Sequence, residues 1–426
     1  MNLLVVGGGG REHAIIKKLK ENPNVATVYA LPGNGGIAAD AVCVPEIGAK
    51  DISAIVDFAK SHSIDFAVVA PDDPLALGCV DRLHEAGIPC FGPNAAAARI
   101  EASKVFSKNL MKKYGIPTAG YEVFDDPAKA LAYLRETNTF PIVIKADGLA
   151  LGKGVLIPQT LAEAEAAVKT IMEDKAFGDS GNEIVIEEFL TGPEVSVLAF
   201  TDGTAIAPMV SSMDHKRVGD GDTGLNTGGM GTIAPNPYYT PETARLCMDT
   251  IFLPTLSAMR SEGCPFKGCL YFGLMLTPSG PKVIEYNCRF GDPETQVVLP
   301  LLKTDLLTVM QAVENETLAD LNVEWSDGAA ACVILASGGY PSHYEKGKPM
   351  TFPASLPENV TVYHAGDKLE HGTLVTNGGR VLGVTAAAPT LKQALQDAYA
   401  TAETIHFDGA YMRRDIGRRA LAALEG

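Results

Sequence analysis

Acidic, amide and basic side chains alternate at the end of a short apolar segment, VIEYNCRFGDPETQ, at residues 283–296. If this segment is a β-strand, Val283, Glu285, Asn287 and Arg289 share one face, because successive side chains of a strand point to opposite sides. A carboxylate, an amide oxygen and a guanidinium on one face suit a Mg²⁺–phosphate site, since Mg²⁺ takes oxygen ligands together with substrate phosphates. The alternative is a polar strand edge that faces solvent.

A second candidate phosphate site is PIVIKADGLALGKGV, at residues 141–155. It is not a Walker A loop, because only three residues separate Gly148 from Gly152 and because Gly154 stands where a Ser or Thr is needed. A strand that ends in Lys145, followed by a glycine-rich hairpin with Lys153, favours a flap that covers a triphosphate. The alternative is a β-hairpin with lysines on its surface.

The N-terminal segment GGGGREHA, at residues 7–14, follows a predicted strand and opens a predicted helix. Backbone N–H groups at a helix N-terminus favour anions. A dinucleotide fingerprint is excluded, because Glu12 or His13 stands where its third glycine belongs and no acidic residue closes the second strand. The segment therefore indicates a loop for phosphate or a small substrate, in preference to a purely structural turn.

Two polar segments are less specific. IVIEEFLTGPEVS, at residues 184–196, is an apolar strand that runs into acidic residues and is equally consistent with a solvated strand end. Residues 211–236 include DHKRVGDGDTGLNTGGMG and predict a long, functional loop without regular structure. His215 in that loop has no second His nearby, so we expect a structural hydrogen bond and not a metal ligand.

The composition limits the partners. The net charge of −16 over 426 residues argues against nonspecific binding to nucleic acid or to an anionic membrane. None of the eight Cys forms a CxxC pair, which predicts reduced core thiols in a cytoplasmic protein. The N-terminus has no basic region and is expected to be a first strand and not a signal peptide.

The elements that must position these residues fall into three units. Short apolar strands alternate with helical patterns in residues 1–100, which predicts an α/β, doubly wound parallel sheet. Helices are expected from about Ala95 to Tyr114 and, near the end of the chain, from Arg413 to Leu424. The following pattern is α+β, and a third unit begins after Trp325. The predicted domains are 1–101, 102–325 with a smaller lobe at about 121–190, and 326–426.

Taken together, these segments resemble the ATP-grasp enzymes and, among them, the phosphoribosylamine–glycine ligase (glycinamide ribonucleotide synthetase) family. The resemblance extends from residue 7 to 386 and is carried by GGGGREHA, PGNGG, FGP, SKVF, PIVIKADGLALGKGV, IEEFLTGPEVS, DHKRVGDGDTGLNTGGMG, VIEYNCRFGDPETQ and VTNGGRVLGVTA. It implies an N-terminal substrate-binding domain, a two-lobed ATP-grasp core and a small C-terminal α/β domain. Three departures lie on the amine-substrate side: Gly8 in place of Asn, Ala70-Pro71-Asp72 in place of Gly-Pro-Glu, and Leu225 in place of Pro.

The resemblance also implies a reaction, in which ATP, glycine and 5-phosphoribosylamine give glycinamide ribonucleotide, ADP and phosphate through glycyl phosphate, in purine synthesis. Small molecules would be the only partners, with no nucleic acid and no membrane, and we expect a monomeric, monofunctional chain. Alternatives are another ATP-grasp carboxylate–amine ligase or a carboxylase of purine synthesis, a non-catalytic nucleotide sensor, which the transfer-site charges disfavour, and an oxidoreductase, which the broken fingerprint disfavours.

Roles for individual residues follow from the same resemblance. The residues that it implies for ATP are Lys104 and Lys145 on the phosphates, Gly152, Lys153 and Gly154 in the flap, Glu187, Glu188, Phe189 and Leu190 on the adenine, and Glu194 on the ribose. Glu285 and Asn287 would bind Mg²⁺ or Mn²⁺, and Arg289, Lys145 and Asp214 would be catalytic. The amine and glycine side would be lined by Gly10, Arg11, Glu12, Pro32, Gly33, Asn34, Lys216, Asn226, Thr227, Gly228 and Gly229, with Arg289 also facing the substrate.

Overall fold

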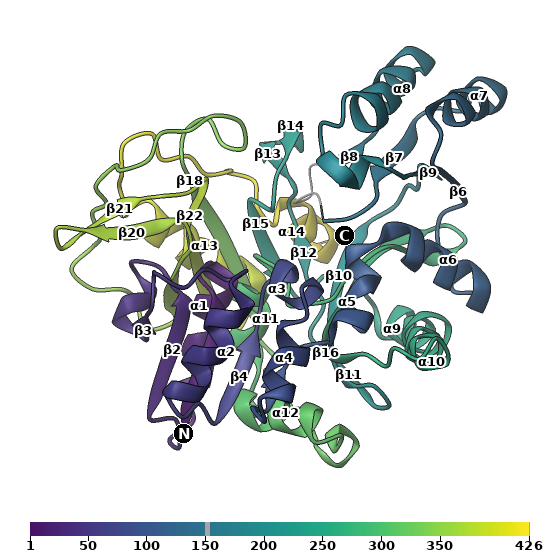
Figure 1. Cartoon of the computed structure of the whole chain (residues 1–426). Coiled ribbons are helices and arrows are strands. Elements are labelled where there is room, and N and C mark those ends of the chain that lie inside the picture. The colour runs from purple at the N-terminus through teal and green to yellow at the C-terminus, as the bar shows by residue number, and fades with distance from the viewer. Residues whose placement is uncertain (150–153, 426) are drawn as a thin grey trace.

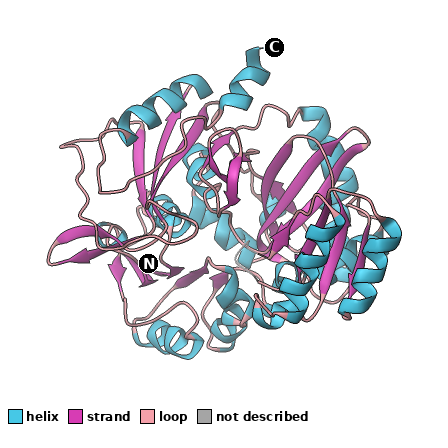
Figure 2. Cartoon of the chain, turned by 90° about the horizontal axis from the view of Figure 1, so that it is seen from above, coloured by secondary structure: helices cyan, strands magenta, loops and turns pink. Residues whose placement is uncertain are grey.

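The computed structural model describes residues 1–149 and 154–425. Its elements form an N-terminal sheet, a projecting lobe that carries α7 and α8, a central antiparallel sheet and a further sheet toward the C-terminus (Figure 1). Most helices lie outside the main groups of strands (Figure 2). Among the described residues, no helix is long and apolar enough to cross a membrane.

The N-terminal sheet is parallel and has the order β3-β2-β1-β4-β5, as expected for a doubly wound sheet. Alternate residues of β1 enter different cores: Leu3 and Val5 pack in one cluster, and Leu4 and Val6 in another. Both faces are therefore buried, which explains the continuous apolar runs. The elements are β1 (Asn2–Gly7), α1 (Gly10–Leu19), β2 (Thr27–Pro32), β3 (Val42–Cys43), α2 (Ile52–Ser61), β4 (Phe66–Val69), α3 (Asp72–Ala76), α4 (Cys79–Glu85) and β5 (Cys90–Phe91).

The helix predicted over residues 95–114 is two helices, α5 (Ala95–Ala102) and α6 (Lys104–Tyr114). Ser103 between them is extended, and its hydroxyl accepts a hydrogen bond from the Phe106 amide. A serine N-cap satisfies one of the amides that a new helix leaves without a partner. The break aims the start of α6 and Lys104 toward the cleft described below.

The projecting lobe is a four-stranded antiparallel sheet of order β6-β9-β7-β8. In β7, Ile142, Ile144 and Ala146 pack against α7 and α8, so Val143 and Lys145 point to the opposite face. The elements are β6 (Tyr121–Phe124), α7 (Pro127–Thr137), β7 (Ile142–Ala146), β8 (Val155–Leu156), α8 (Leu161–Val168) and β9 (Ile184–Glu188).

The central sheet has the order β11-β10-β16-β17 and is buried on both faces. One face packs on α9 and α10, and the other on α12, which also covers the N-terminal sheet. The elements are β10 (Glu194–Asp202), β11 (Ile206–Pro208), α9 (Pro241–Cys247), α10 (Leu253–Ser261), β16 (Lys267–Thr277), β17 (Gly280–Asn287), α11 (Thr295–Val298) and α12 (Leu306–Glu314).

A bulge in β17 corrects the predicted alternation. Gly273 pairs with Glu285 and Leu274 pairs with Val283, so Ile284 is the extra residue. A bulge reverses the facing of the residues on one side of it. Val283 is consequently buried in the core, whereas Glu285 and Asn287 line the cleft. The prediction that Val283 shares their face is wrong.

The segment 211–236 is not a structureless loop, as predicted, but contains four short strands: β12 (Met213–Asp214), β13 (Arg217–Gly219), β14 (Thr223–Asn226) and β15 (Gly231–Ala234). Strands β13 and β14 form a hairpin of their own, while β12 and β15 join a larger sheet. These strands cannot be recognised from the sequence, because two to four residues are too few to show an alternation of apolar and polar side chains.

That larger sheet has the order β12-β15-β18-β22-β19, and it crosses the predicted boundary at residue 326. Strand β15 pairs with β18 from Gly231↔Val333 to Ala234↔Ala330. The remaining elements are β18 (Ala329–Ala336), β19 (Val360–His364), β20 (Asp367–Glu370), β21 (Thr373–Thr376), β22 (Arg380–Ala388), α13 (Leu391–Ala402) and α14 (Arg418–Glu425). The last helix was expected from Arg413, but residues 413–417 are not helical.

Candidate active site

A cavity of about 890 Å³ lies where the N-terminal sheet, the projecting lobe, the central sheet and the C-terminal sheet meet. This volume suits a substrate the size of a nucleotide. Of the predicted site residues, those that line it are Arg11, Lys104, Lys145, Gly154, Glu187, Glu188, Phe189, Leu190, Glu194, Asp214, Lys216, Asn226, Thr227, Gly228, Glu285, Asn287 and Arg289. Gly152 and Lys153 lie outside the described residues.

One end of the cavity is lined by lysines around a buried carboxylate. Glu187 Oε1 lies 2.9 Å from Lys145 Nζ, and Glu187 Oε2 lies 2.9 Å from Lys108 Nζ. Lys145 also donates to the Ile284 carbonyl at 3.0 Å, and Lys104 donates to the Gly148 carbonyl at 2.7 Å. Burial lowers the pKa of Lys108 to about 8. Two ammonium groups therefore share one carboxylate, and the third, on Lys104, lines the same cavity, which suits a polyanionic ligand.

Lys108 was not predicted, although a signal for it exists. It lies four residues after Lys104 on α6, and residues four apart share one face of a helix. Glu187 is predicted on the adenine through its backbone groups, and its side chain is directed to Lys145 and Lys108.

The end of β17 supplies oxygen ligands and a guanidinium. Asn287 Nδ2 donates to Glu101 Oε1 at 3.0 Å, and Arg289 Nη2 lies 2.8 Å from the same oxygen. Glu101, which was not predicted, thereby orients both side chains. Burial raises the pKa of Glu285, but Lys216, Lys145 and other cations outweigh burial and hold that pKa below its ordinary value.

These residues fit a divalent cation that is shared with phosphate. Glu285 offers a carboxylate, and the amide nitrogen of Asn287 is taken by Glu101, which leaves the Asn287 amide oxygen as a donor to a metal. No group of three or more His, Cys, Asp or Glu that could hold a metal occurs within residues 1–149 and 154–425. A site with two protein oxygens is typical of Mg²⁺ that completes its shell with phosphates and water. Arg289 Nε is buried and has no hydrogen-bond partner among the described residues. A bound anion would supply the missing acceptor.

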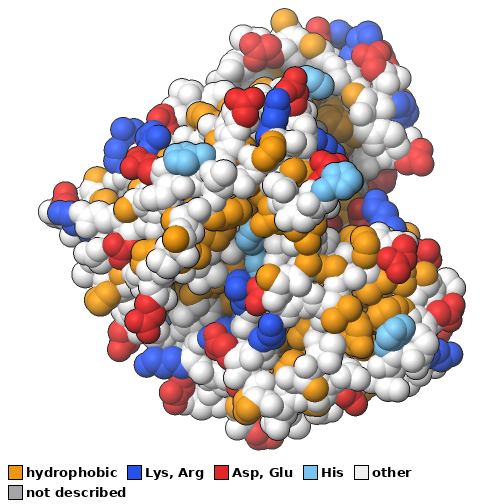
Figure 3. Space-filling model, turned by 90° about the vertical axis from the view of Figure 1, so that its left-hand side faces the viewer, with side chains coloured by type: hydrophobic (Ala, Val, Ile, Leu, Met, Phe, Trp, Pro, Cys, Tyr) orange, Lys and Arg blue, Asp and Glu red, His pale blue; other side chains and the backbone are white. Residues whose placement is uncertain are grey.

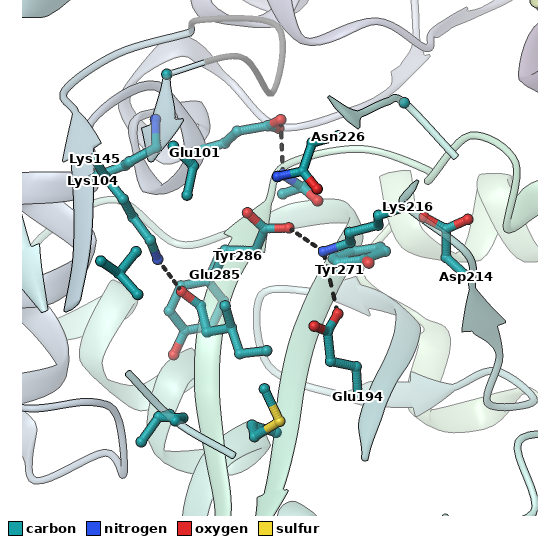
Figure 4. Close-up of a pocket in the computed structure, with 18 of the residues that line it drawn as sticks. Glu101, Lys104, Lys145, Glu194, Asp214, Lys216, Asn226, Tyr271, Glu285 and Tyr286 are labelled. Atoms are coloured by element: carbon teal, nitrogen blue, oxygen red, sulfur yellow. Dashed lines mark hydrogen bonds and ion pairs between the residues drawn. The ribbon is translucent and has the colours of Figure 1, made fainter. Parts of the chain in front are cut away.

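Acidic residues surround Lys216 at the other end of the cavity. Its Nζ lies 3.6 Å from Glu194 Oε2 on β10 and 3.6 Å from Glu285 Oε1 on β17 (Figure 4). Glu194 and Glu285 raise the pKa of Lys216 well above its usual range. Burial, assisted by the charge of Glu294, raises the pKa of Asp214 well above its usual range. The negatively charged form of Asp214 is therefore disfavoured in this part of the cavity.

The N-terminal loop brings only Arg11 to the cavity. Arg11 Nε lies 2.6 Å from Glu12 Oε1, and Glu12 Oε2 accepts from the Gly9 amide at 2.6 Å. Gly7 precedes this turn with a φ of +123°, and a Cβ there would lie 2.5 Å from the Glu12 side chain. The Glu12 carboxylate therefore fixes the Arg11 side chain to the backbone of the loop.

Six of the predicted substrate residues, including Glu12, do not line the cavity. Asn34 Nδ2 donates to the carbonyls of Gly8, His364 and Ala365 at 3.0, 2.9 and 3.2 Å. Gly229 lies against Asp214, where a Cβ would come within 2.6 Å of Oδ1. The residues outside the lining are Gly10, Glu12, Pro32, Gly33, Asn34 and Gly229.

Arg380 is a cavity residue that the sequence reasoning did not single out, although it lies in the motif VTNGGRVLGVTA. It comes from β22 and donates to the carbonyls of Gly228 and Asp292 at 2.7 and 2.9 Å, and Nη2 lies 3.2 Å from Asp292 Oδ2. The C-terminal part of the chain thus adds a guanidinium beside the predicted Asn226–Gly228 segment.

Comparisons with known proteins find relatives along most of the chain. Three family models match consecutive segments, described as the Phosphoribosylglycinamide synthetase N domain at residues 1–101, its ATP-grasp (A) domain at 102–295 and its C domain at 330–419. The chain is 47% identical over 425 residues to a phosphoribosylamine–glycine ligase of Vibrio vulnificus (strain YJ016), with 99% of each chain covered.

Two solved structures are similar over nearly the whole chain. The crystal structure of phosphoribosylamine–glycine ligase from Thermotoga maritima has a TM-score of 0.86 and 37% identity, covering 98% of this chain and 100% of that one. The biotin carboxylase domain of the Hydrogenobacter thermophilus 2-oxoglutarate carboxylase has a TM-score of 0.73 and 17% identity, covering 96% and 91%. This second likeness concerns the fold alone.

Proposed function

This chain belongs to the phosphoribosylamine–glycine ligase family, and from that premise we propose how the residues of its cavity share the work of the reaction. The chain is an ATP-dependent ligase that joins glycine to 5-phosphoribosylamine, giving glycinamide ribonucleotide in purine biosynthesis. The observation that carries the proposal is one cavity with lysines at one end, and with Arg11, Asp214, Lys216 and Arg380 at the other.

ATP lies at the lysine end in this proposal. Lys104 and Lys145 contact its phosphates, and the segment from Gly152 to Gly154 covers them. Glu187 to Leu190 border the adenine and Glu194 the ribose. The support is that Lys145 and Lys104 both reach the cavity with only carboxylate or carbonyl partners among the described residues. Lys108 completes this group by sharing Glu187.

Glu285 and Asn287 hold a divalent cation, Mg²⁺ or Mn²⁺, with the nucleotide. Such a cation neutralises phosphate charge when it is bound. Arg289, fixed by Glu101, faces the transferring phosphate or the glycine carboxylate, and its planar guanidinium suits either group.

The chemistry needs no nucleophilic side chain. A carboxylate oxygen of glycine attacks the γ-phosphorus and ADP leaves, which gives glycyl phosphate. The amine nitrogen of phosphoribosylamine then attacks the acyl carbon, and phosphate leaves with that carboxylate oxygen. Positioning and charge stabilisation supply the acceleration.

The attacking amine must lose a proton as the amide forms. Asp214 is the acceptor in this proposal, because it lines the cavity on the side assigned to the amine substrate and its raised pKa makes its carboxylate a stronger base. Lys216 and Arg380 offer positive charge for the substrate phosphate, with Arg11 on the same side.

Isotope transfer tests the intermediate. With glycine labelled by ¹⁸O in both carboxylate oxygens, one label should appear in inorganic phosphate and one should stay in the product amide. Label released into water would contradict glycyl phosphate. A turnover assay that omits glycine is the control, because ADP release without glycine would contradict the ligase assignment of this cavity.

The finer partner assignments are also proposals. Small molecules are the partners, the chain acts in the cytoplasm as a monomer, and it does not bind nucleic acid. The support is the net charge of −16 and a face on which basic and acidic side chains are interspersed (Figure 3). Light scattering of the purified chain should give about 45 kDa, the mass in the sequence. Twice that mass would contradict the monomer.

A further inference from the structure

The β13–β14 hairpin leads directly into the proposed substrate segment Asn226–Gly228, yet it has little support of its own. Its two strands pair only with each other among the described residues, and Thr223–Asn226 is exposed. A two-stranded hairpin is marginally stable in water. Its position over the cavity must therefore be fixed by contacts from elsewhere.

Those contacts come from residues 411–419, which we call the C-terminal strap. Arg413 in the strap is 1% exposed, although it is an arginine. Its Nε and Nη2 lie 2.8 and 2.9 Å from the two oxygens of Asp415, a bidentate pair. Its Nη1 donates to the Arg217 carbonyl and to Asp222 Oδ1, both at 3.0 Å. A buried guanidinium requires such partners, and here two of them belong to the hairpin.

Further bonds bind the hairpin turn to the same strap. Asp415 Oδ2 accepts from the Gly221 amide at 2.8 Å, and Asp220 Oδ1 accepts from the Arg414 amide at 2.8 Å. The Tyr411 hydroxyl donates to the Val218 carbonyl at 2.8 Å. Both acidic side chains of the turn, Asp220 and Asp222, are therefore directed to the strap.

We infer that Arg413 is a positioning residue for the ligation: with Asp222 and Asp415 it holds the β13–β14 hairpin so that Asn226–Gly228 face the amine substrate. This inference rests on the proposed function, which places the amine substrate at that segment. Arg413 does not line the cavity, so it acts through the hairpin. A lysine could not replace it, because a single ammonium cannot form the fork on Asp415 and also reach the hairpin.

The test compares two variants with a neighbouring control. Arg413→Met removes the guanidinium that the strap contributes, and Asp222→Asn weakens the same contact on the hairpin side; these two are the clamp variants. The Asp222 side chain is partly exposed, so its substitution puts folding at little risk. Arg414→Gln is the control, since among the described residues the Arg414 side chain reaches only the exposed Glu403. We expect each clamp variant to raise the KM for 5-phosphoribosylamine about tenfold, with kcat and the KM for ATP little changed.

The double variant should raise that KM no more than the larger single change, because both substitutions break one contact. Hydrogen exchange gives a readout independent of activity: amides of residues 217–228 should exchange faster in both clamp variants and not in Arg414→Gln. An unchanged KM for 5-phosphoribosylamine in both clamp variants, or an equal rise in the KM for ATP, would overturn the inference.

Asn226→Ala separates the inference from the function on which it rests. If Asn226→Ala raises the KM for 5-phosphoribosylamine but the clamp variants do not, the positioning role of Arg413 fails alone. If Asn226→Ala leaves that KM unchanged, the proposed substrate segment itself fails, and the inference fails with it.

Discussion

Glu285 lies at the boundary between the two halves of the cavity, with the lysines of the ATP side on one flank and Lys216 on the other. Its carboxylate therefore faces several cations, and an added divalent cation would compete with them for its charge. This is the expected setting of a metal ligand that is needed only when phosphates accompany the metal.

Glu285→Gln should lower turnover by about 10² or more, because the amide keeps the shape but loses the charge that holds the cation. The fold should be retained. Turnover measured against Mg²⁺ concentration should show a shifted metal requirement as well as a lower maximum. Glu262→Gln is a suitable control, since Glu262 pairs with Lys113 on the surface. Normal activity with an unchanged metal requirement would remove Glu285 from the metal site.

At the scale of single residues, the sequence allowed the charged ends of motifs to be predicted, but not the residues that orient them. Lys145, Glu285 and Arg289 end apolar strands, where a charge stands out. No such pattern marks the residues that orient them. Only the folded chain shows that Lys108 contacts Glu187, that Glu101 contacts Asn287 and that Arg380 contacts Gly228.

At the scale of elements, His215 joins the start of the hairpin region to the C-terminal strap. His215 Nδ1 lies 3.0 Å from the Gly231 carbonyl, and Nε2 accepts from the Gly417 amide at 3.1 Å. Only a neutral ring with the proton on Nδ1 can make both bonds. Burial lowers the pKa of His215 to about 4, as this arrangement requires. The expected structural role of His215 is consistent with these bonds.

This histidine should make stability fall in mild acid. Its folded pKa is below the value of about 6.5 expected in the unfolded chain, so the unfolded state binds more protons between pH 6.5 and pH 4. The free energy of unfolding should then decrease as pH falls through that window, by on the order of 3 kcal/mol from this group. Urea unfolding at several pH values measures it.

His215→Gln cannot take up this proton, so its unfolding free energy should be lower at pH 7 but should fall less steeply between pH 6.5 and pH 4. An identical slope in the variant would show that other groups cause the acid sensitivity.

Elements with a long pattern were predictable, and those set by contacts were not. The parallel N-terminal sheet follows from repeated apolar strands and helices. The bulge at Ile284 and the β13–β14 hairpin have no local pattern, because the first depends on pairing with β16 and the second on the C-terminal strap. Helix α14 begins later than predicted because Arg413 and Asp415 bond to each other and to the β13–β14 hairpin.

At the scale of the whole molecule, the cavity gathers basic groups although the chain as a whole is acidic. The net charge is −16, yet Arg11, Lys104, Lys145, Lys216 and Arg289 converge on one cavity. Residues this far apart in sequence can meet only if the separate sheets are held in a fixed arrangement. Asn34 contributes directly, since its amide connects the N-terminal loop to the backbone at the end of β19.

Asn34→Ala should lower the free energy of unfolding by about 2 kcal/mol, because the carbonyls of Gly8, His364 and Ala365 lose a shared donor. A thermal melt measures the loss, and Asn359→Ala, which alters an exposed asparagine, is the matched control. If stability is unchanged while the KM for 5-phosphoribosylamine rises, Asn34 contacts the substrate directly and its bonds to the C-terminal region matter little.

The sheet that joins β15 to β18 also bears on how such a chain can be inherited. A recombination breakpoint near residue 326 would combine β12 and β15 from one parent with β18, β22 and β19 from another. In the hybrid, the four residue pairs between β15 and β18 would join strands that evolved in different parents. Viable chimeras should therefore exchange residues 211–236 along with everything after residue 326, so that these two distant stretches behave as one heritable block.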